Sequence, residues 1–405
     1  MQYNFVIGLS PLNHALFYLP GFVTKLWVFD SEKATLGARH LKNMLKINLN
    51  DLRIELVADW KYLSRFSRRW DEIVQKTPGT GITQTQAWGE SWWKHFGENH
   101  RLNILIAIQG GQIVGVAPLM ISEEKRHGRS KKILRWIGSR EPESAGASPF
   151  KTFPFAFLAE KNSKTVLLAF LDWIHAHSED WEMMELPIFP SKSPQFSMVQ
   201  KYFTASDYSV WHQSENTCHK LSLLEDAKLK RLLTHADIQG PLDFFKKKGE
   251  LLFWHAKTKA DLDNSLGHFF DHHLATELLK KKISAFADER WKGFVTDLAY
   301  RTLENGMLRL SVASLDQNPL AFQLGFLLKK ELLWGETSLN PEFVKQHPDR
   351  MLLHFVLDYA QKKKFTSVNL SEAAGFFKTK TPLVCESAVV FSSKLDYLWY
   401  RSRAK

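Results

Sequence analysis

The chain has 405 residues, of which 44% are hydrophobic, and Lys and Arg outnumber Asp and Glu by 54 to 43. This length suits two domains, and the hydrophobic content excludes a chain that is disordered throughout. The net charge of +11 permits an anionic partner such as nucleic acid or lipid. Because the basic runs are short and scattered and no nucleic-acid motif accompanies them, we expect an ordinary basic surface and no DNA partner.

The chain has two cysteines, Cys218 and Cys385, which cannot form a disulfide framework. This cysteine usage favours a reducing compartment, and we expect a cytoplasmic protein. We expect no metal site, because the pair His272-His273 has neither a partner cysteine nor an HExxH pattern.

The first 24 residues carry no Lys, Arg, Asp or Glu. Pro11 and Pro20 interrupt any spanning helix, and a basic region typical of a signal peptide is missing, so we expect no integral membrane span. Met44 begins a stretch that looks like a natural start running into a strand. We therefore interpret residues 1–43 as an N-terminal extension outside the fold. Peripheral attachment to a membrane through this segment is the alternative.

Strands and helices alternate along the first half of the chain, as judged from apolar periods of two and 3.6 residues. The predicted strands are 51–57, 102–108, 113–121, 133–138 and 181–186, and the predicted helices are 60–75, 86–96 and 164–177. The turn 109–112, with its two glycines, joins the second and third strands as a hairpin. Pro118 within the hairpin predicts an edge strand or a bulge, because proline cannot donate to a sheet ladder.

The second half carries a similar alternation and ends in a distinctive order of elements. The predicted elements are helix 242–249, strand 251–257, helices 261–280 and 286–305, strands 307–315, 320–328 and 331–335, a helix beginning near Pro348, and strand 365–370. The last five follow the order β-β-β-α-β. This is the order of the acyl-binding half of a GNAT-type N-acyltransferase.

Seven segments extend this likeness over most of residues 60–380: 86–97, 102–120, 134–139, 286–294, 320–326, 339–343 and 368–378. With them the sequence resembles the GNAT-fold acetyltransferase family associated with cellulose and exopolysaccharide biosynthesis, the CelD-like type. FemAB-like aminoacyl transferases share this fold. The resemblance implies an α/β protein with mixed (α+β) sheets and tandem GNAT-like domains. We place these at 44–235 and 236–405, with the active centre in the second.

The resemblance also implies an activity, namely transfer of an acyl group from acyl-CoA (acetyl-CoA) as co-substrate. The acceptor would be an amino or hydroxyl group of a saccharide or small amino compound, in polysaccharide or cell-envelope biosynthesis. Proteins of polysaccharide synthesis are then candidate partners. Two alternatives stay open: a FemAB-like transferase that uses aminoacyl-tRNA, and a non-catalytic GNAT-fold partner of a polysaccharide synthase.

The chain departs from the family in two places. The family commonly closes with Asp-x-x-x-Gly-x-x-x-Tyr-Lys, whereas this sequence has Asn369, Ala373 and Phe377 in the first three places and keeps Lys378. A phenolic general acid is therefore absent from that position. The ordinary Q/R-x-x-G-x-G/A loop, which binds a pyrophosphate, is also missing before the helix that contains Met351.

Two carboxylates are candidate catalytic bases, because an amine must lose a proton before it can attack an acyl group. Glu336 lies where the third strand of the β-β-β-α-β unit ends, and Glu372 follows its last strand. The plain alternative for both is a solvated carboxylate at a strand end.

The start of the helix near Pro348 is the candidate site for the donor, with Arg350, Met351 and Leu352 as binding residues. Free amides and the positive end of a helix dipole suit a phosphate. Ordinary capping by Asp349 is the alternative, since an acidic residue there would partly repel an anionic donor.

Four further residues are candidates for binding the acceptor. Gln323 lies within an apolar strand, and Arg290 and Trp291 could bind a sugar or a carboxylate. Lys378 occupies the position of the family lysine. The alternatives are a water-facing glutamine, a tryptophan of the core and a lysine that faces solvent.

Overall fold

The computed structural model describes residues 8–9, 15–19, 22–25, 52–77, 79–126, 128–139, 157–159, 163–190, 193–218, 220–224, 226–370 and 383–403. The chain divides into two units, Met1–Leu52 and Arg53–Lys405. In the first unit, β1 (Gly8–Leu9), β2 (Ala15–Leu19) and β3 (Phe22–Lys25) pair in an antiparallel sheet. Most of the predicted extension 1–43 lies outside the described residues.

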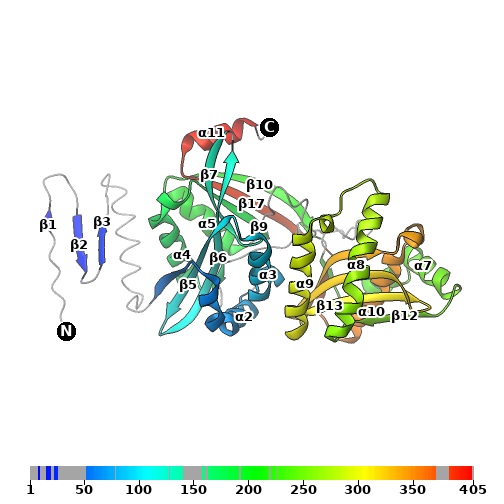
Figure 1. Ribbon diagram of the computed structural model, residues 1–405. Helices are drawn as coiled ribbons and strands as arrows, with labels where there is room; N and C mark the ends of the chain where they lie inside the picture. Colours follow the sequence, from blue (N-terminus) through cyan, green and yellow to red (C-terminus); the bar gives the residue numbers. More distant parts are fainter. Residues whose placement is uncertain are drawn as a thin grey trace. The chain divides into compact units, whose positions relative to one another are not determined.

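The second unit contains two larger sheets (Figure 1). The first sheet has the strand order β10-β17-β9-β7-β6-β5-β4, and β8 pairs with β6 beside this path. Its strands are β4 (Arg53–Val57), β5 (His100–Gln109), β6 (Gln112–Arg126), β7 (Arg129–Trp136), β8 (Leu158–Ala159), β9 (Met183–Pro190), β10 (Ser209–Cys218) and β17 (Leu383–Phe391). Strands β7 and β9 pair in parallel, and the other pairs are antiparallel.

The second sheet has the order β11-β16-β15-β14-β13-β12. Its strands are β11 (Lys220–Ser222), β12 (Leu251–His255), β13 (Leu308–Leu315), β14 (Asn318–Leu328), β15 (Glu331–Leu339) and β16 (Ser367–Asn369). Here β15 and β16 pair in parallel and the other pairs are antiparallel. With α10 (Pro348–Lys362) between β15 and β16, the predicted β-β-β-α-β unit is confirmed.

The two sheets repeat one plan and exchange a strand. Each has four antiparallel strands in a row, then a parallel neighbour, then an antiparallel strand. In the first sheet that last strand is β17, from the end of the chain, which Figure 1 shows beside β10. In the second sheet it is β11, which comes before the predicted division at residue 235. The domain bounds remain a prediction, and both of these strands pair across the division.

The remaining elements are helices. They are η2 (Trp60–Phe66), α2 (Ser67–Lys76), η3 (Ile82–Gln84), α3 (Gln86–Phe96), α4 (Lys164–Ala176), η6 (Ser178–Asp180), α5 (Pro194–Ala205), α6 (Asp226–Leu233), α7 (Ala236–Lys246), α8 (Lys259–Leu279), η7 (Ala285–Ala287), α9 (Glu289–Glu304), η8 (Pro341–Gln346) and α11 (Lys394–Arg403). The predicted bounds of α3 are confirmed, because the Thr85 side chain caps its start and Gly97 follows its end. The predicted helix 60–75 instead begins with the 3₁₀ segment η2.

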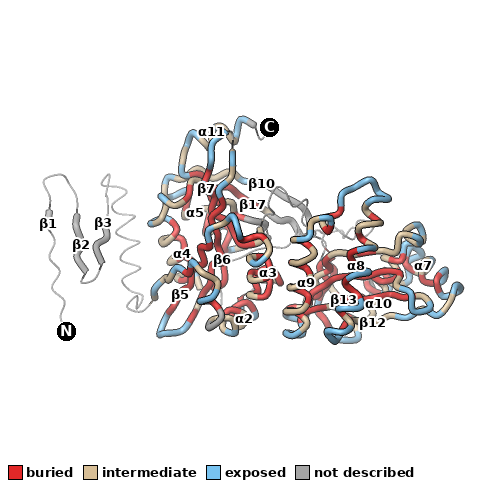
Figure 2. Tube along the Cα trace, in the orientation of Figure 1, coloured by how far each residue is buried: buried red, intermediate tan, exposed pale blue. Residues whose placement is uncertain are grey.

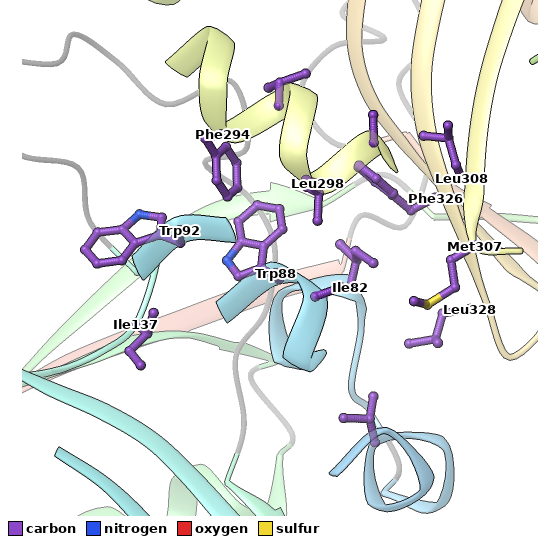
Figure 3. Close-up of a cluster of buried hydrophobic side chains, with 14 of the residues drawn as sticks. Ile82, Trp88, Trp92, Ile137, Phe294, Leu298, Met307, Leu308, Phe326 and Leu328 are labelled. Carbon is purple, nitrogen blue, oxygen red and sulfur yellow. The ribbon is translucent and has the colours of Figure 1, made fainter. Parts of the chain in front are cut away.

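Helices α3 and α9 pack against each other through aromatic side chains. The rings of Trp88 and Phe294 lie 5.1 Å apart, edge to face, and those of Phe96 and Trp291 lie 4.7 Å apart. Figure 3 shows Trp88 pointing toward Phe294, with Met307 and other apolar side chains of the same cluster nearby. Figure 2 shows how much of both sheets is buried. This cluster therefore joins residues from both halves of the chain.

A buried network of charges crosses the first sheet. The Arg135 side chain is 2% exposed and forms ion pairs with Glu124 and Glu185. Lys131 pairs with Glu182 at 2.8 Å and with Asp396 of α11 at 2.9 Å. Removing Glu124 or Glu185 would leave the buried charge of Arg135 poorly compensated, so we expect its ion pairs to favour this arrangement of β6, β7 and β9.

Pro118 is a point where the prediction was wrong, since it lies neither in an edge strand nor at a bulge. Strand β6 has neighbours on both sides, and its register shift with β5 lies at residues 107–108. The pairing of β6 with β7 ends at Leu119, and its pairing with β8 begins at Val116. Pro118 lies between these pairings, where no ladder needs its missing N–H, and its carbonyl accepts from the Ile137 amide at 2.9 Å.

His255, at the end of β12, gives a test of this packing by pH. Its Nδ1 lies 2.9 Å from Ser311 Oγ, and its ring packs on Phe355 and Tyr359. Burial, followed by the nearby charges of Arg309 and Lys257, lowers the pKa of His255 to about 4. The unfolded chain binds this proton near pH 6.5 and the folded chain does not. Stability contributed by neutral His255 is therefore lost as pH falls from about 6.5 toward 4.

We expect His255→Phe to flatten the pH dependence of the urea midpoint in this window. Urea unfolding of both proteins at several pH values between about 4.5 and 7.5 measures the difference. Parallel pH profiles for wild type and variant would contradict the buried neutral histidine.

Candidate active site

A bulge in β15 positions Glu336. Gln323 of β14 pairs with Thr337, and Gly325 pairs with Trp334, so β15 contains one residue more than its partner between these pairs. Such a bulge re-aims the side chains on the longer strand. Gly325 is required opposite it, because a Cβ there would lie 2.8 Å from the Leu333 carbonyl oxygen.

Glu336 is held by a short chain of hydrogen bonds that begins after α8. Phe286 N donates to Ser284 Oγ at 3.0 Å, and Ser284 Oγ lies 2.8 Å from His273 Nδ1. His273 Nε2 lies 3.3 Å from Glu336 Oε1. We assign the proton of His273 to Nε2, because the serine hydroxyl can then donate to Nδ1 while Nε2–H donates to the carboxylate. The imidazole thus orients Glu336.

A pocket of about 190 Å³ opens beside this pair. Its lining comes from three elements: His273, Thr276 and Glu277 of α8, with Lys280 directly after it; Trp334, Glu336, Thr337 and Leu339 of β15; and Asp349 and Leu353 of α10. The Glu336 side chain is 24% exposed, whereas that of His273 is 11% exposed. The carboxylate therefore faces the pocket, and the histidine supports it from the side of the core.

Two more carboxylates line the same pocket. Glu277 accepts from Lys280 at 2.8 Å. Burial raises the pKa of Asp349, and its Oδ1 has no hydrogen bond within the described part of the chain. The His347 ring lies 3.9 Å from that oxygen. Glu336 and Asp349 give the pocket oxygen atoms that can accept from a ligand, and Glu336 adds a negative charge that suits an ammonium group.

The start of α10 does not fit the diphosphate of coenzyme A. Pro348 is its first residue and has no N–H to offer, and Asp349 puts a carboxylate in the first turn. Arg350 Nη1 lies 3.5 Å from Asp237 Oδ1. The side chains of Met351 and Leu352 are buried in the core, so only their backbone could serve a ligand.

Of the four predicted acceptor residues, the three that the structure describes are not among the residues that line this pocket. Gln323 is buried beside the bulge, where its Nε2 donates to the Leu324 carbonyl at 2.8 Å. Arg290 and Trp291 lie on α9 and are not among the residues that line the pocket. Trp291 belongs to the core, and Arg290 forms an ion pair with Asp288 at 2.6 Å.

Two predicted residues, Glu372 and Lys378, lie outside the described residues. Three residues that the sequence analysis did not assign to the site are present in or beside the pocket: His273, Ser284 and Asp349. The roles proposed for Glu336 and the other candidates remain predictions.

Comparison with known families now adds to this geometry. Residues 234–379 match the model of the acetyltransferase (GNAT) domain. The matched residues lie in the second half of the chain. The matched range contains the second sheet from β12 to β16, the pocket, and the helices α8, α9 and α10.

Solved structures share the fold over most of the chain. The crystal structure of FemX has a TM-score of 0.57 at 10% sequence identity, covering 82% of this chain and 98% of that chain. A conserved protein of unknown function from Bacteroides thetaiotaomicron has a TM-score of 0.54 at 8% identity, covering 84% and 100%. No curated protein is similar enough in sequence to count as a match.

These likenesses, at such low identity, concern the fold alone. Together with the repeated strand order of the two sheets, they confirm the predicted α/β class with mixed sheets and tandem GNAT-like domains. None of the helices in the described part of the chain is long and apolar enough to cross a membrane.

Proposed function

We propose that the protein is an acyltransferase that moves an acyl group onto an amine bound in the pocket between α8, β15 and α10. The observation that carries this proposal is the carboxylate of Glu336, set in a bulge and held 3.3 Å from His273 in a pocket with Glu277 and Asp349. The GNAT domain over residues 234–379 supports the reaction class.

The reaction needs one proton acceptor and no covalent enzyme intermediate. The acceptor enters as an ammonium ion, and Glu336 takes a proton from its nitrogen. The neutral nitrogen then attacks the carbonyl carbon of an activated acyl ester or thioester, which forms the new C–N bond. The bond from that carbon to the leaving oxygen or sulfur breaks, and the leaving group departs with the electron pair. The attacking nitrogen gives its second proton to this leaving group, so that a neutral amide and an alcohol or thiol result. His273 holds Glu336 in place by donating from Nε2.

The acceptor that we favour is an amino sugar or another amine of cell-envelope or polysaccharide biosynthesis. The carboxylates of the pocket support an amine over a hydroxyl group, because an ammonium ion donates to them and carries the opposite charge. The polysaccharide setting rests on the sequence resemblance to the CelD-like type. Polysaccharide-synthesis proteins are proposed partners on the same ground.

The donor has two candidates. Acyl-CoA is the co-substrate that the GNAT resemblance implies. The start of α10 favours the second candidate, aminoacyl-tRNA, because Pro348 and Asp349 do not fit a diphosphate there. The net charge of +11 also permits a nucleic-acid donor.

Acylation of an amine panel tests the proposal and separates the donors. The purified chain is incubated with an amino sugar, an amino acid or a lysine peptide, together with acetyl-CoA, a longer acyl-CoA or charged tRNA. We expect mass spectrometry to detect an amide product in at least one combination. Thermal shift against free CoA and tRNA gives an independent result, since a ligand at about 100 times its Kd adds about 2.7 kcal/mol of stability.

The outcomes lead to different conclusions. A product formed with acyl-CoA would identify the thioester as the donor and would require that its diphosphate binds away from the start of α10. A product only with charged tRNA assigns the ester donor. If no amine is acylated and no donor raises the melting temperature, the enzyme proposal is wrong, and a non-catalytic partner of a polysaccharide synthase replaces it.

A further inference from the structure

The end of α8 exposes large apolar side chains next to the pocket. Leu278, Leu279 and Ile283 are 75%, 64% and 90% exposed. Single exposed leucines are common on protein surfaces, but here three large aliphatic residues within six positions are all exposed, and exposed apolar residues that gather in this way often mark an interaction site. Residues 278–283 are called the α8 tip below. Figure 2 shows exposed chain at this connection between α8 and α9.

Three lysines, Lys280, Lys281 and Lys282, lie between these apolar residues, and all three are exposed. The backbone holds them in a defined helix end. Lys281 has a left-handed φ of 57°, its amide donates to the Leu278 carbonyl, and the Lys282 amide donates to the Glu277 carbonyl. The tip therefore presents its apolar and basic side chains from an ordered backbone.

The end of α10 has the same backbone conformation as the α8 tip but exposes no apolar residues beside its lysines. It also has three exposed lysines, at 362, 363 and 364. Lys364 has a φ of 56°, and the amides of Lys364 and Phe365 donate to carbonyls three and five residues earlier, as at the α8 tip. Phe365, however, is only 8% exposed and packs in the core. The same backbone conformation at a helix end therefore allows the following apolar residue to be buried on α10, whereas the aliphatic residues of the α8 tip stay exposed.

We propose that the α8 tip docks on an anionic lipid surface. The three aliphatic side chains enter the boundary between headgroups and acyl chains, and the lysines meet the lipid phosphates while their stems lie along the apolar layer. Interleaved lysines argue against a protein partner, because the buried centre of a protein interface is depleted in lysine. A lipid surface accepts both residue types at one depth.

This docking brings the pocket to the membrane surface. Glu277 and Lys280 line the pocket and lie at the same end of α8 as the tip. This step rests on the proposed acyltransferase function and adds the substrate class: the amine acceptor is carried by a lipid. The docking itself does not depend on catalysis, so a binding experiment can fail while acylation of a soluble amine succeeds, and the reverse.

Vesicle co-sedimentation of the full chain tests the proposal. The vesicles are phosphatidylcholine alone, or phosphatidylcholine mixed with phosphatidylglycerol. We expect binding to the anionic vesicles that weakens as salt rises, and little binding to the neutral ones. Replacing Leu278, Leu279 and Ile283 with serine should lower the partition coefficient about tenfold or more, since each removes an aliphatic side chain from the lipid. Lys281→Gln with Lys282→Gln should remove most of the preference for anionic vesicles.

Matched variants at other helix ends test whether binding depends on the α8 tip itself or only on the total charge and exposed apolar surface of the protein. Lys363→Gln with Lys364→Gln removes the same amount of charge from the lysine run at the end of α10, and Leu395→Ser removes a leucine that is 79% exposed on α11. Both should bind vesicles as wild type does.

Three results would overturn the proposal. The first is that the wild type does not bind anionic vesicles. The second is that the serine variant binds them as well as the wild type does, which would place the binding elsewhere, such as in residues 1–24, which carry no Lys, Arg, Asp or Glu. The third is that, without vesicles, the serine variant forms smaller oligomers than the wild type. That result would show that the α8 tip contacts a second copy of the chain.

Discussion

Replacing Glu336 with glutamine is expected to lower kcat for amine acylation about 10²- to 10⁴-fold, the range that a positioned general base contributes. The amide keeps the shape of the side chain and can still accept from His273 Nε2, which now lies 3.3 Å from Glu336 Oε1. It cannot take the proton of an ammonium ion. The loss should therefore appear in turnover, measured with the amine and donor identified by mass spectrometry, while the urea midpoint stays at the wild-type value.

A second carboxylate of the pocket provides the control. Glu277→Gln also removes a negative charge from the lining, but the Glu277 side chain is paired with Lys280 at 2.8 Å and forms no hydrogen bond with the His273 side chain among the described residues. We expect this variant to raise KM for the amine with little change in kcat. Equal losses of kcat in both variants would show that the pocket needs charge alone, and a wild-type rate for Glu336→Gln would remove Glu336 from the chemistry.

The sequence predicted the second sheet well because local signals determine most of it. Strands β13, β14 and β15 are joined by two-residue turns with left-handed residues, Asp316-Gln317 and Lys329-Lys330, which favour hairpins between neighbouring strands. Helix α3 was predicted to the residue, because a capping threonine and a following glycine mark its ends. Each of these signals lies within a few residues of the structure that it determines.

The exchanged strands could not be predicted in the same way. No strand was predicted after residue 370, yet β17 lies between β9 and β10 and completes the first sheet. An alternating pattern can indicate a strand, but the choice of partner depends on which sheet edge is open in the folded chain. The partner residues of β17 lie more than 160 residues earlier in the sequence, and no local sequence feature identifies them.

The candidate site was predicted in part for a similar reason. Glu336 was assigned to a strand end, whereas β15 continues to Leu339 and bulges at this residue. Its partner His273 belongs to the buried side of α8, one turn after Phe269 and Phe270. A histidine at a buried position of an amphipathic helix is a signal that could have been followed, but its contact with Glu336 spans 63 residues and depends on the fold.

Trp291→Ala is expected to lower the free energy of unfolding by about 3–5 kcal/mol, as large aromatic deletions in cores do. Trp291 is 2% exposed and its ring lies 4.7 Å from that of Phe96 and 5.6 Å from that of Phe294, so the substitution opens a cavity between α3 and α9. Urea unfolding measures the loss.

The neighbouring Arg290→Ala is the matched control for this test. The Arg290 side chain is 41% exposed and pairs with Asp288 near the surface, where ion pairs contribute about 0–1 kcal/mol. We therefore expect a change of about 1 kcal/mol or less. If Trp291 instead served as a platform for a sugar, as the sequence allowed, its loss would weaken acceptor binding and leave the urea midpoint unchanged. A large loss of stability with unchanged KM assigns the indole to the contact that joins the two halves of the chain, and leaves the pocket at Glu336 as the place where the acceptor binds.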